Sequence, residues 1–196
     1  MTSQPLSTGH QVPSPLQGRR LLLGVSGSIA AYKAAALTRL LVKAGAEVQV
    51  ILTEAATAFV TPLTLGTLSK KPVLTGFLRD AASGQWHNHV ELGLWAEAYL
   101  IAPASANTIG QLANGLCPNL LSAVYLSARC PVFLAPAMDL DMYAHPAVTQ
   151  NMQRLRSFGN HVIESPSGEL ASGLAGPGRM LEPEEIVAEL EKFFVR

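Results

Sequence analysis

Two carboxylates follow directly on an apolar run in the stretch FLAPAMDLDMY, residues 133–143. Asp139 and Asp141 could bind a metal as a pair, could handle a substrate, or could be a helix N-cap followed by a first-turn acid. The residues alone favour the capping interpretation, because Asp is a preferred N-cap and acids stabilise the first turn of a helix. Only 14% of the residues are charged, so two acids so close together at one strand end are unusual for this chain and need an explanation.

A pair of histidines is a second candidate for chemistry. His87 and His89, in WHNHVELG, have a spacing that could serve a metal ion or a base near neutral pH. No further His or Cys at ligand spacing supports a metal, so we expect no metal site. His89 stands at the start of a predicted helix, where it could act as an acid or base or could orient a substrate.

Two turns built from small residues could hold a phosphate. The stretch GVSGS contains Gly27, the stretch APASANT contains Ser105, Asn107 and Thr108, and each opens a predicted helix. Free N–H groups at a helix start bind phosphate well. Either turn could also be ordinary, since GVSGS matches neither a P-loop nor GxGxxG and Ser105 could be a plain N-cap.

The elements that must position these residues alternate along the chain. Short apolar runs predict strands, and segments with helical periodicity lie between them. Buried runs without alternation are typical of parallel strands that are covered on both faces. We therefore predict a Rossmann-like α/β fold of three layers, with helices on both faces of a mostly parallel six-stranded sheet. The six strands are expected at residues 20–27, 46–53, 72–77, 98–104, 131–137 and 160–165.

The carboxyl ends of parallel strands meet at one edge of the sheet, and ligands bind in the crevice there. Both small-residue turns, the ILT that ends at Thr53, and the acids after residue 137 all follow predicted strands. We therefore expect these polar strand ends to converge on one crevice.

Length and composition limit the possible partners. A chain of 196 residues with 48% hydrophobic residues suits one packed domain, which we place at residues 19–196 after a disordered N-terminal tail at residues 1–18. Fourteen basic residues balance fourteen acidic ones, so we expect a small-molecule partner, with no nucleic acid and no membrane. Cys117 and Cys130 are expected to be reduced thiols of a cytoplasmic protein.

Five stretches in a fixed order are more specific than any one of them: GVSGSIAAYK, NHVELGLWA, APASANT, APAMDLDMY and GELASGLAGPGRM. Together they resemble the flavin-dependent cysteine decarboxylase superfamily, and most closely its phosphopantothenoylcysteine decarboxylases of coenzyme A synthesis. The resemblance extends from about residue 19 to about residue 186. It implies a single FMN-binding domain and a homotrimer, often assembled further into a homododecamer, with the active site between subunits.

The resemblance also implies roles for individual residues. His89 corresponds to the essential histidine of the family, and Asp139 and Ser172 occupy two further positions of the family's catalytic machinery. FMN would be held by Gly27, Ser28, Ile29, Thr53, Ser105, Ala106, Asn107 and Thr108. The substrate would be held by Lys33, Ala137, Met138, Arg179 and Met180.

The implied reaction is the decarboxylation of 4'-phosphopantothenoylcysteine to 4'-phosphopantetheine. In the family, FMN oxidises the cysteine side chain to a thioaldehyde, and the thiocarbonyl accepts the electrons when carbon dioxide leaves. An enethiol remains. A cysteine in the glycine-rich flap then acts as an acid while hydride returns.

Two residues depart from the family pattern. Asp139 replaces an asparagine associated with the substrate carboxylate, and a carboxylate ~4 Å from another would repel it by roughly 4 kcal/mol at an effective dielectric near 20. We therefore expect Asp139 to be protonated or strongly hydrogen-bonded when substrate binds. Ser172 replaces the flap cysteine, and a hydroxyl is a much weaker acid than a thiol of pKa ~8.5. Either another group protonates the enethiol, or the reaction stops there.

Other functions stay open from the sequence. Ser172 favours an oxidative decarboxylase of a peptidyl or other cysteine that releases an enethiol. The two altered positions together favour a non-catalytic FMN-binding regulatory protein. Prenyl-flavin synthases share the fold, but the charged residues that bind a prenyl phosphate are not recognisable. Lys33 and Arg179 could also be ordinary solvated surface charges.

Overall fold

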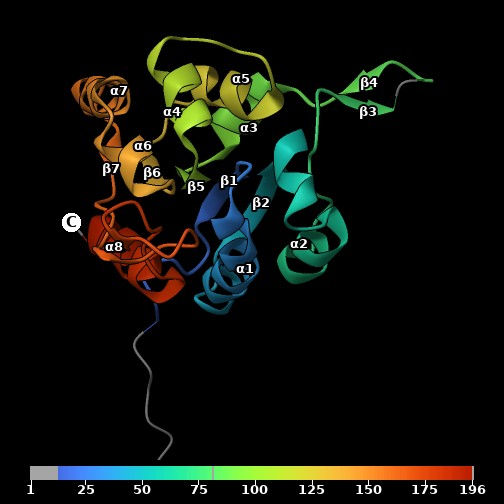
Figure 1. Ribbon diagram of the computed structural model, residues 1–196. Coiled ribbons are helices and arrows are strands. Elements are labelled where there is room, and N and C mark those ends of the chain that lie inside the picture. Colours follow the sequence, from blue (N-terminus) through green and yellow to red (C-terminus); the bar gives the residue numbers. More distant parts are fainter. Residues whose placement is uncertain (1–12, 81, 196) are drawn as a thin grey trace, which may run out of the picture.

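The computed structural model describes residues 13–80 and 82–195, and its core is a five-stranded parallel sheet (Figure 1). The strand order is β2-β1-β5-β6-β7. Numbered within the sheet this is 2-1-3-4-5, so the direction of winding reverses between β1 and β5 and opens a crevice there. The strands are β1 (Arg20–Val25), β2 (Glu47–Leu52), β5 (Ala98–Ala104), β6 (Val132–Pro136) and β7 (His161–Val162).

Helices cover both faces of this sheet (Figure 1). One face carries α1 (Lys33–Lys43), α2 (Pro62–Ser69) and α8 (Pro183–Val195). The other carries α3 (His89–Trp95), α4 (Ala106–Ala113), α5 (Leu120–Ser127) and α7 (Pro146–Ser157). Three short helices lie at strand ends: η1 (Ile29–Tyr32), η2 (Glu54–Ala58) and α6 (Leu140–Ala144).

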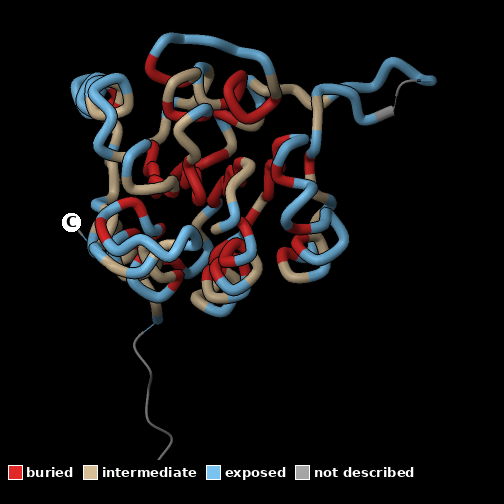
Figure 2. Tube along the Cα trace, viewed as in Figure 1, coloured by how far each residue is buried: buried red, intermediate tan, exposed pale blue. Residues whose placement is uncertain are grey.

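The alternation of side chains along β1 shows why both layers are needed. Leu21 and Leu23 join the hydrophobic cluster of α1 and α8, while Leu22 joins the cluster of α4 and α5 on the opposite face. Figure 2 shows the buried residues concentrated on the sheet and the inner sides of the helices. The predicted three-layer α/β fold is confirmed.

The prediction of six strands is wrong by one strand. Residues 72–77 contribute one isolated parallel bridge, in which the Leu74 N–H donates to Val50 O at 3.0 Å and Leu74 O accepts from Leu52 N–H at 2.8 Å. Pro72 has no N–H to continue the ladder, and Gly76 has no side chain to pack.

Two small hairpins were not predicted. β3 (Leu78–Asp80) pairs antiparallel with β4 (Gln85–Trp86), and this hairpin projects from the body of the molecule (Figure 1). β8 (Gly168–Glu169) pairs antiparallel with β9 (Ala175–Gly176) inside the glycine-rich stretch GELASGLAGPGRM. Strands of two or three residues are too short for an alternating pattern to be recognised.

The N-terminal tail was predicted to be disordered as far as residue 18, but the structure describes its last six residues, 13–18. Residues 1–12 lie outside the described residues, but residues 13–18 pack against the domain. Leu16 is fully buried, and the Ser14 hydroxyl donates to Glu191 Oε1 at 2.6 Å. A composition rich in Pro, Ser and Gly conceals the contribution of Leu16, whose side chain joins the hydrophobic core. None of the helices in the described residues is long and apolar enough to cross a membrane.

Candidate active site

A cavity of about 960 Å³ lies at the carboxyl ends of β1, β2, β5 and β6. It is the crevice expected from the convergence of polar strand ends. Every residue predicted to hold the cofactor lines it: Gly27, Ser28, Ile29, Thr53, Ser105, Ala106, Asn107 and Thr108. Every residue predicted to hold the substrate also lines it: Lys33, Ala137, Met138, Arg179 and Met180.

The turn after β1 is shaped by a close approach to the turn after β2. A Cβ atom on Gly27 would lie 2.7 Å from Ala55 Cβ, which is too close for any residue but glycine without movement. The Ser28 hydroxyl caps η1 by accepting a hydrogen bond from Ala30 N–H at 3.3 Å. The first backbone groups of η1 therefore lie at the cavity wall.

The end of β5 is tied to the end of β1 by one buried hydroxyl. Ser26 Oγ donates to Pro103 O at 2.8 Å and accepts from Ser105 N–H at 2.9 Å. Ser105 in turn caps α4, accepting from Thr108 N–H at 3.3 Å. Ser105 is thus an N-cap, one of the two roles that the sequence left open, and the first turn of α4 lies at the cavity.

The hydroxyl of Thr53 provides a test of whether this cavity fits a polar ligand. Thr53 Oγ1 is buried and has no hydrogen-bond partner among the described residues. Leaving a buried polar atom without a hydrogen bond costs free energy, so the presence of such an atom in a native structure needs an explanation. Because Thr53 lines the cavity, a polar group of a bound ligand would satisfy its hydroxyl.

Asp139 and Asp141 take the separate places that the capping interpretation predicts. Asp139 is the N-cap of α6, and its Oδ1 accepts a hydrogen bond from Leu140 N–H at 2.6 Å. It is half-buried and lines the cavity. Asp141 is an exposed acid in the first turn of α6.

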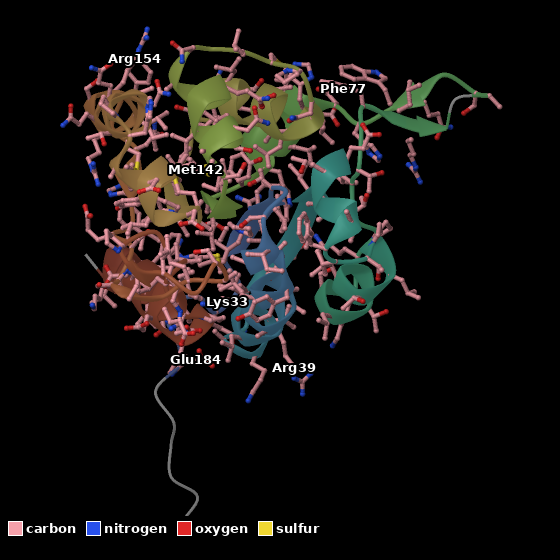
Figure 3. All side chains as sticks on the ribbon, in the orientation of Figure 1. Lys33, Arg39, Phe77, Met142, Arg154 and Glu184 are labelled. Carbon is pink, nitrogen blue, oxygen red and sulfur yellow. The ribbon has the colours of Figure 1, made fainter. Side chains whose placement is uncertain are left out.

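Two cations of the cavity share one carboxylate. Lys33 Nζ donates to Met180 O and to Glu182 Oε1, both at 2.9 Å, and an Arg179 N–H donates to the same Glu182 oxygen. The hydrogen bond from Lys33 holds the pKa of Glu182 below its ordinary value. The interpretation of Lys33 as a solvated surface charge is wrong, because only 5% of this residue is exposed. Figure 3 labels Lys33, the first residue of α1, whose side chain contacts the segment that leads into α8.

The β8–β9 hairpin forms a flap beside the cavity, which Glu169, Leu170 and Ala171 line. The segment after β9 is held to the segment after β6 by a hydrogen bond from Met138 N–H to Gly178 O at 3.0 Å. Gly178 has φ +123°, and an added Cβ would lie 2.5 Å from Met138 O, so glycine is required there. Ser172 is exposed between the two strands and is not among the residues that line the cavity.

His89 also lies outside the cavity. It is the first residue of α3, its ring centroid is 5.6 Å from that of Trp86, and its buried Nδ1 has no partner among the described residues. His87 lines a second cavity of about 510 Å³, where burial lowers its pKa. The described residues contain no group of three or more His, Cys, Asp or Glu that could hold a metal ion.

Sequence reasoning missed several residues of the site. Glu182 has a signal in the sequence, an acid three residues after Arg179, but only the fold brings Lys33 to it. Further lining residues were also missed, and most of them lie within a few residues of a predicted turn: Ala30, Tyr32, Glu54, Ala55, Gln111, Pro118, Asn119, Met142, Glu169, Leu170, Ala171 and Gly178.

A sequence model of the flavoprotein family matches residues 10–195, which include all of the elements that form this site. The chain belongs to the flavoprotein family. This flavoprotein is 63% identical over 135 residues to a cysteine/cysteine sulfinic acid decarboxylase of an unknown prokaryotic organism, covering 69% of this chain and 37% of that protein. It is 47% identical over 179 residues to the coenzyme A biosynthesis bifunctional protein CoaBC of Vibrio cholerae serotype O1, covering 91% of this chain and 45% of that protein. The chain thus spans less than half the length of these curated relatives.

Two solved structures are similar over nearly their whole length. One is a PPC decarboxylase mutant, with serine in place of a cysteine, complexed with pantothenoylaminoethenethiol; it is 34% identical with a TM-score of 0.82, covering 92% of this chain and 100% of that one. The other is the FMN binding protein AtHal3, 33% identical with a TM-score of 0.78, covering 90% of this chain and 98% of that one. These likenesses confirm the predicted superfamily, its closeness to the phosphopantothenoylcysteine decarboxylases, and FMN as the cofactor of the family.

Proposed function

We propose that this flavoprotein is an FMN-dependent carboxy-lyase that decarboxylates the cysteine moiety of 4'-phosphopantothenoylcysteine to give 4'-phosphopantetheine in coenzyme A synthesis. One observation carries the proposal. All of the predicted cofactor and substrate residues line a single cavity, in a chain similar to a PPC decarboxylase over that protein's full length.

The residues of the cavity fit FMN. The first turns of η1 and α4 lie at the wall of the cavity, and the N-terminal turn of a helix is a favourable place for a phosphate. Thr53 Oγ1 offers an unsatisfied hydroxyl for a polar group of the ribityl chain or phosphate. A cavity of about 960 Å³ has ample room for both a cofactor and a small substrate.

Bound FMN would supply a two-electron acceptor for the carbon that carries the substrate sulfur, and the resulting thiocarbonyl makes loss of carbon dioxide easy. The residues of this chain bind and orient the substrate. Ala137 and Met138 form a wall of the cavity, and Met180 is a buried anchor of the flap. Arg179, half-exposed at the base of the flap, is the cation available to a substrate carboxylate or phosphate.

The proposed site is completed by a second subunit. We propose a homotrimer, which can assemble further into a homododecamer, in which His89 of one subunit meets the cavity of its neighbour. The support is that His89 lies outside the cavity of its own chain, at the start of α3, with a buried Nδ1 that lacks a partner in the described residues. The unpaired Cys117 and Cys130 support a cytoplasmic location.

A second candidate is the decarboxylation of cysteine itself or of another cysteine derivative, ending at the enethiol. The relative that is 63% identical to this chain is named for cysteine and cysteine sulfinic acid. Ser172 supports an early end to the reaction, because a hydroxyl is a poor replacement for an acidic thiol. The solved PPC decarboxylase with serine in place of a cysteine holds an aminoethenethiol compound.

Mass spectrometry of the product tests the proposal. Protein loaded with FMN is incubated with 4'-phosphopantothenoylcysteine, and the product mass is compared with that of the substrate. Loss of carbon dioxide alone supports full conversion to 4'-phosphopantetheine. Loss of carbon dioxide with two hydrogens means that the same site stops at the enethiol. Recovery of unchanged substrate from flavin-loaded protein contradicts the proposal.

A further inference from the structure

The cations and anions that line the cavity are not equally compensated. Lys33 and Arg179, the two cations, both donate to Glu182 Oε1, and Lys33 is almost completely buried in this arrangement. Each cation therefore has a carboxylate partner before any ligand binds, although the two cations share it.

Asp139 is in the opposite situation. It lines the same cavity and is half-buried, yet it makes no ion pair with any cation among the described residues. Within the described residues, its carboxylate accepts one hydrogen bond, the capping bond from Leu140 N–H at 2.6 Å. Asp139 therefore brings a negative charge to the cavity wall without a counter-ion from the described part of the chain.

Helix capping favours an acid at this position but does not require a charge. Asn and Ser cap a helix about as well as Asp does, so the bond to Leu140 N–H requires only an oxygen. A half-buried carboxylate is costly to leave uncompensated, whereas a neutral amide would avoid this cost. The negative charge of Asp139 therefore needs an explanation beyond capping.

The chemistry of cysteine suggests the counter-ion. In free cysteine the carboxylate and the ammonium are attached to the same carbon, so a protein carboxylate close enough to repel the first is also close enough to attract the second. In an N-acylated cysteine the nitrogen is a neutral amide, and the repulsion is not offset. A carboxylate at this position therefore distinguishes the two classes of substrate by charge.

We propose that Asp139 is a specificity-determining residue that admits cysteine substrates with a free α-ammonium group, with the ammonium as the counter-ion of its carboxylate. This inference rests on the proposed function of the cavity as a cysteine decarboxylase site. It adds free cysteine to the substrates of that site and makes free cysteine the substrate that the charge of Asp139 favours.

The substitution Asp139→Asn tests this proposal with little risk to folding, because Asn keeps the cap of α6 and removes only the charge. Carbon dioxide release from L-cysteine and from 4'-phosphopantothenoylcysteine is measured with the FMN-loaded wild type and variant. In the variant, kcat/KM for cysteine relative to the acylated substrate should fall at least tenfold, which corresponds to about 1.4 kcal/mol. Asp141→Asn is the matched control, since it removes an exposed acid of the same helix outside the cavity, and it should leave this ratio unchanged.

Binding gives a second readout that does not depend on turnover. Calorimetry compares S-methyl-L-cysteine, which has a free ammonium, with its N-acetyl derivative. The wild type should bind the free amine more tightly, and Asp139→Asn should lose this preference. An unchanged preference in Asp139→Asn, or a wild type that decarboxylates only the acylated substrate, overturns the role of Asp139 while the decarboxylase function stands. A wild type that decarboxylates neither substrate overturns the proposed function together with the inference that rests on it.

Discussion

The hydroxyl of Thr53 is buried at the wall of the cavity with no partner in the described residues. Thr53→Val keeps the shape of the side chain and removes this hydroxyl. The free energy of unfolding of the FMN-free protein should not fall, because no hydrogen bond within the described structure is lost. The FMN dissociation constant should rise about fivefold to tenfold, the effect of one lost hydrogen bond of about 1 kcal/mol.

Flavin fluorescence titration measures this effect, with Thr53→Ser as the control. Serine keeps the hydroxyl, so its affinity for FMN should remain close to that of the wild type. Equal affinity in the valine variant would show that the Thr53 hydroxyl does not contact the cofactor.

Glu182 provides a prediction about pH. Its pKa in the folded state is held below the ordinary value of 4.5 by the hydrogen bond from Lys33. A lowered folded-state pKa contributes stability that is present above the unfolded pKa and is lost as the pH falls through the folded pKa. Glu182→Gln should therefore lower the free energy of unfolding by about 1 kcal/mol near neutral pH, a modest value because the carboxylate is partly exposed.

Urea unfolding at a series of pH values measures this difference, which should shrink as the pH falls below 4.5. Glu184→Gln is the control, since this exposed acid of α8 makes no ion pair within the described structure. A loss of stability in Glu182→Gln that is the same at all pH values would argue against the charge pair with Lys33.

At the residue scale, the sequence predicted most of the site. The cofactor and substrate residues were inferred from motifs, and most of them gather because their motifs follow strands of one parallel sheet. Arg179 and Met180 instead reach the cavity from the segment after the β8–β9 hairpin. Glu182 was missed because its partner Lys33 is 149 positions away, and no local pattern connects them. His89 belongs to α3 and Ser172 to the β8–β9 hairpin, and neither element follows a strand end at the cavity. The fold of one chain does not bring either residue to the cavity.

At the scale of elements, the close approach of η1 and η2 shapes the cavity. Gly27→Ala would force a Cβ to within 2.7 Å of Ala55 Cβ, so one of these two turns must move. Overpacking of this kind costs about 1–3 kcal/mol, and we expect a lower thermal midpoint and weaker FMN binding. Gly76→Ala is the control, because an added Cβ there meets no atom within 4 Å. Thermal unfolding of the two variants side by side checks the prediction, and equal midpoints would contradict it.

The long elements were predictable, and the short ones were not. β1 has a clear apolar pattern and lies within the strand predicted at residues 20–27, and α1 lies between this strand and the next, where a helical segment was expected. The segment at residues 72–77 has the apolar residues of a strand, but Pro72 and Gly76 limit its pairing to Leu74. The turn at residues 13–18 is fixed by the burial of Leu16, a tertiary contact that its polar composition conceals.

At the scale of the whole molecule, a shared active site can be tested by mixing variants. His89→Asn should lose activity but bind FMN, and Gly27→Asp should lose FMN but keep His89. If each site takes its cavity from one subunit and its histidine from the next, mixed oligomers should regain activity. Random mixing of equal amounts should restore roughly a quarter of the wild-type rate of carbon dioxide release. Mixed oligomers without any recovery, identified by native mass spectrometry, would contradict a shared site.

The measurement that tests the central claim most directly is an FMN titration of the wild type and of Ala106→Trp, which fills the cavity at the start of α4. Absorbance and fluorescence give the affinity and the number of FMN molecules bound per chain, and circular dichroism confirms that both proteins are folded. We predict one FMN per chain in the wild type and a large loss of binding in the folded variant. A wild type that binds no FMN, or a variant that binds it as tightly, would contradict a flavin site at these strand ends.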